Sequence, residues 1–187
     1  MAWPCSVRND ATMKFEPTPL SGAYVVDLVR FEDERGFFAR SFCQQEFETH
    51  GLNPRLAQCN VSFNSRRGTL RGMHFQIKPH QEVKLVRCTR GAIWDVIVDL
   101  REDSLTRLHW HAVELSADNR LALYVPEGFA HGFQTLVDHS EVLYQMSEFY
   151  YPEFAYGVRW DDPRIGIRWP LPDPILSERD RSYPLLP

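Results

Sequence analysis

The sequence lacks the segments that mark membrane and secreted proteins. Its first seventeen residues, "MAWPCSVRNDATMKFEP", contain no apolar core of signal-peptide length. No other stretch has enough consecutive apolar residues to cross a bilayer. Cysteines are few, and Cys5, Cys43, Cys59 and Cys88 are scattered without a C-x-x-C pair. These absences indicate reduced thiols and favour a cytoplasmic protein.

The chain also lacks an excess of positive charge. Its formal net charge is −4 at pH 7, with acidic and basic residues mixed along 187 residues. This balance argues against nucleic acid or a membrane surface as the main partner, because both carry dense negative charge. A local basic pocket for an anionic small molecule remains compatible with it. The length fits one domain with a sizeable core.

Many short strands are expected, and few helices. Aromatic residues make up 13% of the chain, 13 residues are proline, and turn residues recur throughout. The predicted strands are 24–31, 36–42, 56–63, 69–74, 83–89, 92–100, 110–115, 121–125, 132–136 and 141–146. The one convincing helix is 43–51, "CQQEFETHG", which ends at Gly51. Because no strand–helix–strand spacing appears, the pattern predicts an all-β jelly roll or sandwich.

Two segments say more about packing. In "AIWDVIVDL", alternation puts one wholly apolar face opposite a face interrupted by Asp95 and Asp99. The apolar face consists of Ala92, Trp94, Val96, Val98 and Leu100. From residue 151 onward the chain is rich in proline and aromatics and has little periodicity. It holds too many large apolar residues to stay solvated, so we expect it to pack back over the domain.

Histidines in β-barrels often bind metals, but the spacing here is poor. His74 in "GTLRGMHFQ" is followed by Phe75 and Gln76, so the usual H-x-H pair is missing. His131 in "PEGFAH" could supply one ligand. His109 and His111 form H-x-H on one strand face, yet no further ligand follows at a suitable spacing. The sequence predicts no metal site, while a metal-dependent oxygenase using His74 and His131 stays open as an alternative.

General acid–base chemistry accounts for the same histidine differently. A neutral imidazole at His74 can accept a proton once a carboxylate fixes its tautomer. Lys84 and Arg71 supply positive charge for a developing oxyanion, and the phenol of Tyr144 can donate a proton. Each residue alone is more often structural. Their occurrence together favours an enzyme over a binding module without catalysis.

Seven ordered motifs carry a resemblance to a known family. They are "FEDERGFFARSF", "LRGMHFQ", "KLVRCTRGAIWDVIVDLR", "YVPEGFAHGFQTL", "VLYQMSEFYYPE", "IGIRWP" and "LSERD". In this order they resemble the dTDP-4-dehydrorhamnose 3,5-epimerases, sugar-nucleotide epimerases of the cupin fold. The resemblance implies an N-terminal extension, 1–16, before a single cupin domain, 17–187. It further implies a jelly roll with a few short helices and the C-terminal tail packed over the site.

The resemblance implies an activity without metal or organic cofactor. The family epimerises a dTDP-4-keto-6-deoxyhexose at C3 and C5, giving the precursor of dTDP-L-rhamnose. Its general base corresponds to His74, paired with Asp180 of "LSERD". Its proton donor corresponds to Tyr144, and Lys84 corresponds to the lysine beside the 4-keto oxygen. To reach His74, Asp180 must fold back across a sheet, on a tail anchored by Trp160, Ile165, Ile167 and Trp169.

Further positions follow from the same resemblance. Substrate-contacting positions fall on Gln58, Asn60, Arg71 and His131. Arg35 matches a diphosphate-binding arginine, and because the family forms homodimers with exchanged strands, it is expected at the neighbour's site.

Three residues depart from the family pattern. Arg40 stands for a frequent glutamate, Phe149 for a tyrosine, and Arg179, a substrate-binding candidate, for a lysine. These departures bear on the nucleotide and the sugar substituents, and they leave a mono-epimerase or a 3,4-ketoisomerase of an unusual deoxysugar pathway as alternatives.

One local conflict concerns the strand that carries the base. Strict alternation puts Arg71 and His74 on opposite faces, although both are assigned to one site. A bulge at Gly72 would re-aim one of them.

Overall fold

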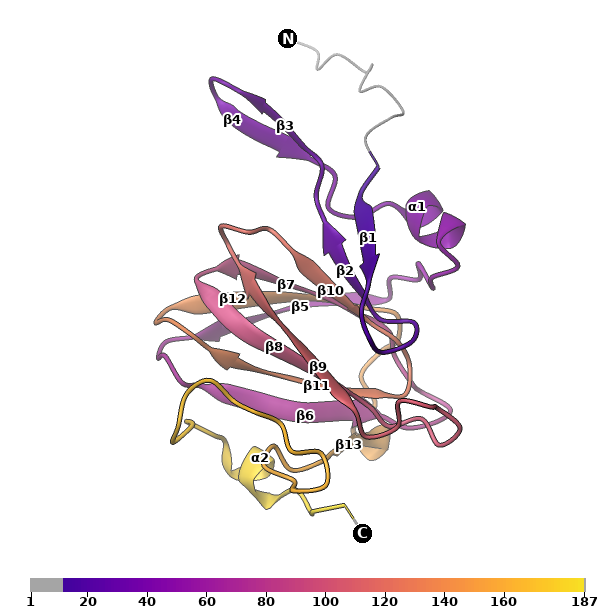
Figure 1. Cartoon of the computed structure of the whole chain (residues 1–187), viewed down its shortest axis with the longest axis vertical. Helices are drawn as coiled ribbons and strands as arrows, with labels where there is room; N and C mark the ends of the chain where they lie inside the picture. Colours follow the sequence, from indigo (N-terminus) through magenta and orange to yellow (C-terminus); the bar gives the residue numbers. More distant parts are fainter. Residues whose placement is uncertain (1–11, 187) are drawn as a thin grey trace.

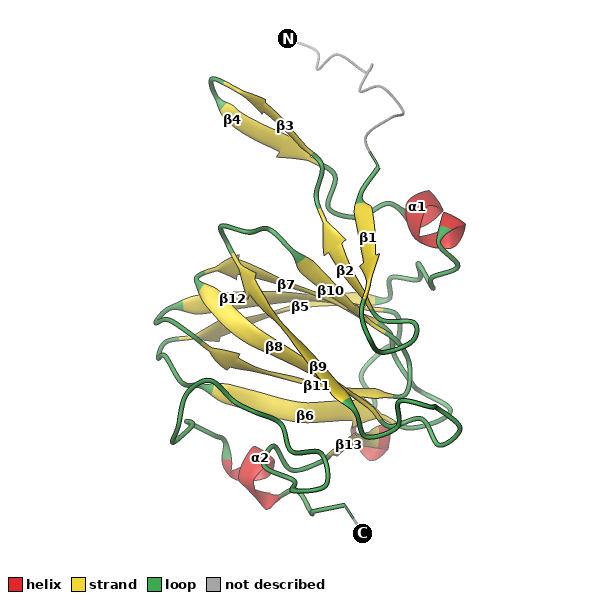
Figure 2. Ribbon diagram, in the orientation of Figure 1, coloured by secondary structure: helices red, strands yellow, loops and turns green. Residues whose placement is uncertain are grey.

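Two antiparallel sheets pack face to face in the computed structural model, which describes residues 12–186 (Figure 1, Figure 2). The six-stranded sheet has the order β1 (Lys14–Pro17), β2 (Tyr24–Asp27), β10 (Ala122–Val125), β7 (Lys84–Arg90), β12 (Ser140–Met146) and β5 (Gln58–Asn64). The five-stranded sheet has the order β13 (Ala155–Gly157), β6 (Leu70–Gln76), β11 (Phe129–Thr135), β8 (Ala92–Asp99) and β9 (Trp110–Ser116). This is the predicted jelly-roll sandwich.

The remaining elements are short and lie outside the sandwich. They are the hairpin strands β3 (Arg30–Asp33) and β4 (Gly36–Ala39), the helices α1 (Gln44–Thr49) and α2 (Glu178–Ser182), and the 3₁₀ turn η1 (Pro152–Phe154). Every predicted strand overlaps an observed one, but the predicted segment 24–31 is divided between β2 and β3. The division follows from Leu28, which turns into the apolar cluster around Phe47 and takes the chain out of the sheet.

The core between the sheets comes from strand alternation. On β8, Ile93 and Ile97 point inward and pack with Val86 and Leu123 of the facing sheet. Phe133, on the neighbouring strand β11, belongs to the same cluster. The opposite face of β8 is also covered, because Trp94, Val96 and Val98 belong to a separate apolar cluster. The predicted apolar face of this strand is therefore the outer one. The inner face carries Asp95 and Asp99, both fully buried.

The C-terminal segment covers that outer face, as predicted. Val158 exchanges two backbone hydrogen bonds with Met73, and Ile165, Ile167 and Trp169 pack on the outer cluster. The indole of Trp169 donates to the carbonyl of Trp160, which closes a turn in the tail. Burying these apolar groups offsets the entropy of ordering a segment with little regular structure. Near the end of the tail, α2 lies next to β6 (Figure 1).

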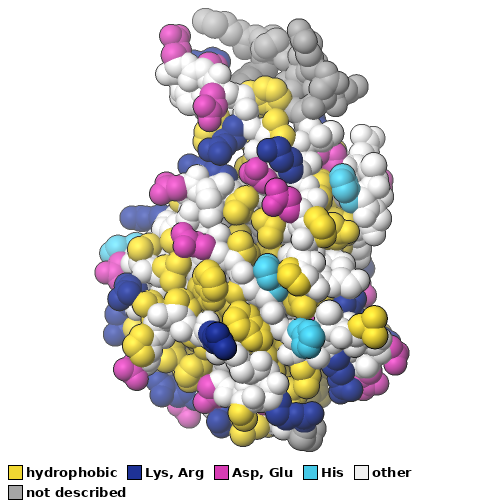
Figure 3. Space-filling model, viewed as in Figure 1, with side chains coloured by type: hydrophobic (Ala, Val, Ile, Leu, Met, Phe, Trp, Pro, Cys, Tyr) yellow, Lys and Arg dark blue, Asp and Glu magenta, His cyan; other side chains and the backbone are white. Residues whose placement is uncertain are grey.

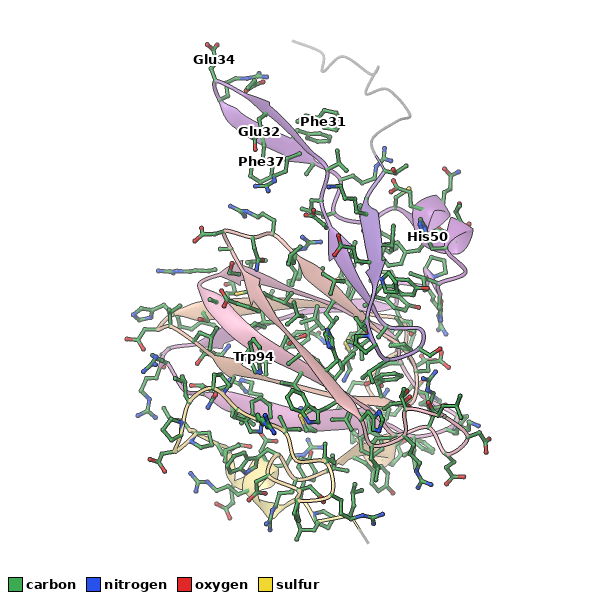
Figure 4. All side chains as sticks on the ribbon, viewed as in Figure 1. Phe31, Glu32, Glu34, Phe37, His50 and Trp94 are labelled. Atoms are coloured by element: carbon green, nitrogen blue, oxygen red, sulfur yellow. The ribbon has the colours of Figure 1, made fainter. Side chains whose placement is uncertain are left out.

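The β3–β4 hairpin stands clear of the two sheets (Figure 4). Its side chains Phe31 and Phe37 are 45% and 43% exposed. Basic and acidic side chains are interspersed on the face shown in Figure 3, in keeping with the mixed charge of the sequence. Among residues 12–186, no helix is long and apolar enough to cross a membrane.

The proposed domain division remains a proposal. Residues 14–16 of the proposed N-terminal extension belong to β1 and pair with β2. Residues 1–11 lie outside the described residues.

Candidate active site

A cavity of about 510 Å³ is lined by strands of both sheets and by the tail. It brings together seven of the ten predicted site residues. They are His74, Lys84, Tyr144, Asn60, Arg71, His131 and Arg179. Asp180 lies behind His74, whereas Gln58 and Arg35 do not line the cavity.

The predicted pairing of His74 with Asp180 is present. Asp180 Oδ1 lies 2.6 Å from His74 Nε2, although 106 positions separate the two residues in the chain. Ser177 begins α2 as its N-cap, with its side-chain oxygen accepting from the backbone N–H of Asp180. This cap fixes the first turn and aims the buried Asp180 carboxylate at β6. Tyr183 packs edge-on against the imidazole and fills space that a side chain at Gly157 would occupy.

Electrostatics fix the protonation of this pair. Burial alone would raise the pKa of Asp180, but hydrogen bonds from His74, Ser177 and the Gly72 N–H outweigh it and lower the pKa. The carboxylate is thus ionised and accepts the proton of His74 Nε2. Desolvation lowers the pKa of His74, opposed by Asp180 and assisted by Lys84 and His131. The imidazole is neutral near pH 7, with a lone pair on Nδ1.

The bulge predicted at Gly72 is present. His131 on β11 pairs with His74, and Phe133 pairs with Arg71, so three steps on β6 match two steps on β11. Gly72 has φ +144°, and a Cβ there would lie 2.6 Å from Gly132 Cα. The extra residue reverses the alternation, and both Arg71 and His74 line the cavity.

Lys84 lies beside His74, on the facing sheet. Its buried Nζ lies 3.2 Å from the backbone oxygen of His74 and 3.1 Å from Glu82 Oε1. An ammonium group has three N–H donors, and these two contacts use two of them. The third is left for a group in the cavity.

Tyr144 reaches the cavity from β12, in the sheet opposite His74. Burial, together with the nearby Asp95 carboxylate, raises the pKa of its phenol. The phenol therefore keeps its proton at neutral pH and can donate it.

A second imidazole–carboxylate pair includes His131, which lines the cavity. His131 Nε2 is 2.8 Å from Asp95 Oδ1, and both side chains are almost fully buried. Desolvation raises the pKa of Asp95, and the contact with His131 opposes the shift. The pair fixes the His131 ring next to Tyr144, whose ring centroid is 6.1 Å away.

The other predicted binding residues divide into rim and remote positions. Arg71 lines the cavity and is held by Asn64, whose Oδ1 accepts from Nε at 2.7 Å. Gln58 supports the rim, since its Oε1 accepts from the backbone N–H of Tyr150. Arg35 is remote: it is exposed on the β3–β4 hairpin and pairs there with Asp33.

Comparison with known proteins decides the family. The sequence model of the dTDP-4-dehydrorhamnose 3,5-epimerase family matches residues 17–187. The chain belongs to this family. A dTDP-4-dehydrorhamnose 3,5-epimerase of Methanothermobacter thermautotrophicus is 47% identical, over 92% of this chain and 94% of the relative.

Solved structures agree on the fold. The Bacillus anthracis dTDP-4-dehydrorhamnose 3,5-epimerase, with TDP and PPi bound, has a TM-score of 0.91 and 46% identity over 94% of this chain and 100% of that one. A 3′-monoepimerase of Streptomyces bikiniensis, in complex with dTDP-quinovose, has a TM-score of 0.83 and 35% identity over 90% and 86% of the two chains. The chain is thus an isomerase-class sugar-nucleotide epimerase with a cupin-like jelly roll.

The structure shows the contacts of the three residues that depart from the family pattern. Arg40 pairs with Glu46 of α1, with Nη1 and Oε1 2.7 Å apart. Phe149 is half exposed, and its backbone oxygen accepts from Gln76. Arg179 lines the cavity, and its Nη1 lies 3.4 Å from the hydroxyl of Tyr150.

Two carboxylates next to the predicted site residues, Asp95 and Glu82, were not among the residues predicted from the sequence. Asp95 was visible as one of two carboxylates that interrupt a face of a buried strand. Glu82 stands two positions before Lys84, at the start of β7, and this spacing puts both side chains on one side of an extended segment. Polar residues at inward positions of apolar strands were the available signal.

The metal-ligand alternative finds little support in the side-chain arrangement. Among residues 12–186, no group of three or more His, Cys, Asp or Glu could hold a metal ion. Nε2 of His74 and Nε2 of His131 each face a carboxylate. His109 precedes β9, so it and His111 are not both on that strand.

Proposed function

We propose that this protein epimerises a dTDP-4-keto-6-deoxyhexose at C3 and C5, in deoxysugar biosynthesis of the dTDP-L-rhamnose type, by proton transfer through an enolate. The observation that carries the proposal is the placement of base and acid. His74 projects from the five-stranded sheet and Tyr144 from the six-stranded sheet, into one cavity. A sugar ring bound between the sheets has the base on one face and the acid on the other, which inversion at a carbon requires.

Each epimerisation begins with removal of a proton from the carbon next to the ketone. Nδ1 of His74 takes the proton, and the electron pair of the broken C–H bond passes into the enolate, with negative charge on the C4 oxygen. The free N–H of Lys84 donates to that oxygen and stabilises the developing charge. Tyr144 then returns a proton to the opposite face of the carbon. Positioned acid–base pairs contribute about 10²–10⁴-fold per transfer.

Cationic side chains at the rim suit the diphosphate of the substrate. Arg71 and Arg179 both line the cavity, and guanidinium groups match phosphate oxygens in charge and geometry. The free thiols of Cys43 and Cys59 fit the cytoplasm as the compartment of this reaction.

The proposal is tested by proton NMR in heavy water with dTDP-4-keto-6-deoxyglucose. Wild-type protein is expected to place deuterium at C3 and at C5. His74→Ala is expected to abolish exchange at both carbons while circular dichroism stays unchanged. His109→Ala, outside the cavity, is the matched control and retains exchange. Undiminished deuterium exchange in His74→Ala would refute the assignment of His74 as the base.

A mono-epimerase is the second candidate, because a relative of this fold is named as a 3′-monoepimerase. The same spectra separate the two activities. Deuterium at one carbon only identifies a mono-epimerase, whereas deuterium at both carbons supports the 3,5-epimerase. A carbonyl carbon that moves from C4 to C3 identifies a 3,4-ketoisomerase.

A homodimer is part of the proposal, with the β3–β4 hairpin serving the neighbouring subunit. A two-stranded hairpin is marginal by itself in water, and this one exposes Phe31 and Phe37 (Figure 4). Val61 and Phe63, on the edge strand β5, are 62% and 51% exposed. A second copy would cover these apolar groups and bring Arg35 to the other cavity.

Mixing two inactive variants tests this exchange. Arg35→Ala and His74→Ala are each expected to lack activity. Random reassortment makes half of the dimers mixed, and each mixed dimer holds one complete site, so about one quarter of wild-type activity returns. Activity that fails to return in verified mixed dimers contradicts the shared site. Light scattering on each variant verifies the dimer.

A further inference from the structure

Glu82 carries a buried oxygen without a partner at the wall of the cavity. Its side chain is 4% exposed, Oε1 faces Lys84, and Oε2 has no hydrogen-bond partner among the described residues. An unpaired carboxylate oxygen in a desolvated place is costly, so native proteins rarely retain one without a function. Because Glu82 lines the cavity, the missing donor belongs to whatever occupies it.

The neighbouring ammonium restricts what that donor is. Lys84 Nζ keeps one N–H for the cavity, directed to an acceptor such as a ketone oxygen. Glu82 offers only acceptor sites, so it needs an O–H or N–H from the ligand. Oε1 of Glu82 contacts Lys84 Nζ, and Oε2 belongs to the same carboxyl group. The acceptor and the donor of the ligand must therefore also lie close together.

We infer that Glu82 accepts a hydrogen bond from the C3 hydroxyl of the sugar, so that Glu82 and Lys84 together recognise an α-hydroxyketone. The inference rests on the proposed function. In a 4-keto-6-deoxyhexose, C3 carries a hydroxyl next to the ketone, whereas C5 carries the methyl group and the ring oxygen. Glu82 is thus a specificity-determining residue that marks the C3 side of the ketone.

The contact fits the intermediate better than either epimer. When C3 loses its proton, C3 and C4 become planar, and the two oxygens lie side by side in that plane. The carboxylate–ammonium pair presents an acceptor and a donor to these two oxygens whichever configuration C3 had before. Binding that is best in the enolate accelerates the reaction at C3.

The test combines two substrates with two proteins. Deuterium exchange at C5 is measured for the parent sugar nucleotide and its 3-deoxy analogue, using wild type and Glu82→Gln. Glutamine keeps the size of the side chain and an acceptor for Lys84, and thermal unfolding verifies its fold. Wild type is expected to lose about ten- to hundredfold in kcat/KM on removal of the hydroxyl, the value of a hydrogen bond to a charged group. Glu82→Gln is expected to lose much less on the same change.

Each outcome decides the matter. The contact at C3 is established if the losses in kcat/KM from Glu82→Gln and from removal of the C3 hydroxyl are non-additive. The same comparison with a 2-deoxy analogue should give additive losses. Equal losses in both proteins overturn it, as does a 3-deoxy analogue that wild type uses as well as the parent. If Glu82→Gln does not fold, the comparison of 3-deoxy and 2-deoxy analogues with wild type still tests the contact. Only the 3-deoxy analogue should then show the loss in kcat/KM. A wild type that exchanges neither carbon of the parent substrate refutes the proposed function instead.

Discussion

Replacing Asp180 by asparagine should disable the proposed base, His74, while preserving the shape of the site. The carboxylate of Asp180 receives hydrogen bonds from His74, Ser177 and the Gly72 N–H. An amide has one acceptor oxygen and one NH₂ donor, so it cannot accept from donors on both sides. When the NH₂ group faces His74, Nε2 must become the acceptor. The ring proton then moves to Nδ1, and the lone pair that should attack the substrate is lost.

The expected loss in kcat is about 10⁴-fold, the size seen when a carboxylate that holds a catalytic imidazole is replaced by its amide. Deuterium exchange at C3 and C5 measures the loss, and ¹⁵N NMR of the imidazole reports the tautomer. Glu178→Gln, an exposed neighbour on α2, is the control and should behave as wild type. An Asp180→Asn variant with more than about a tenth of wild-type kcat would refute the reasoning, as would an unchanged tautomer.

Other consequences concern pH, stability and the bulge. Because desolvation lowers the pKa of His74 from its ordinary 6.5, kcat/KM should fall on acidification only below pH 6.5; an acid limb above that value would contradict a neutral, buried base. Burial favours protonated Asp99, yet Arg101 and neighbouring hydroxyls outweigh this and lower its pKa to about 2. Ionised Asp99 then adds about 2 kcal/mol of stability, present above pH 3.8 and lost as the pH falls toward 2. In urea, Asp99→Asn should be less stable at pH 7, with the difference shrinking near pH 2; a difference that is constant with pH would refute this. Gly72→Ala should cost about 1–3 kcal/mol, because its Cβ meets Gly132 at positive φ; an unchanged denaturation midpoint would show that the bulge tolerates a side chain.

The sequence predicted the strands well because their alternation reports burial directly. The segment around Val96 and Val98 is one example, although its apolar face packs against the tail and not into the space between the sheets. The bulge was predicted for a physical reason, since two residues three positions apart had to share a face. Short elements such as β1 and α2 were not predicted, because four or five residues carry too little periodicity.

The long-range contacts of the site are harder to predict. Periodicity says nothing about which residue 106 positions away meets His74, and only the resemblance of "LSERD" pointed to Asp180. Asp95 and Glu82 were visible as polar residues, but their contacts were not. The partner of Asp95 is His131 on another strand, and the contact of Glu82 with Lys84 depends on both side chains turning inward. Pairings of this kind become readable only when the register of the sheets is known.

Because the docked tail brings Asp180 to His74, the proposed active site is complete only after the tail has docked. The strands of the sandwich from β2 to β12 can pair before the segment from residue 151 onward is in place. His74 has no carboxylate partner until α2 docks. Detachment of that segment would silence the enzyme while the sandwich is still intact. Inactivation by heat or denaturant should therefore precede the global transition, and amide exchange in the segment should track the loss of turnover.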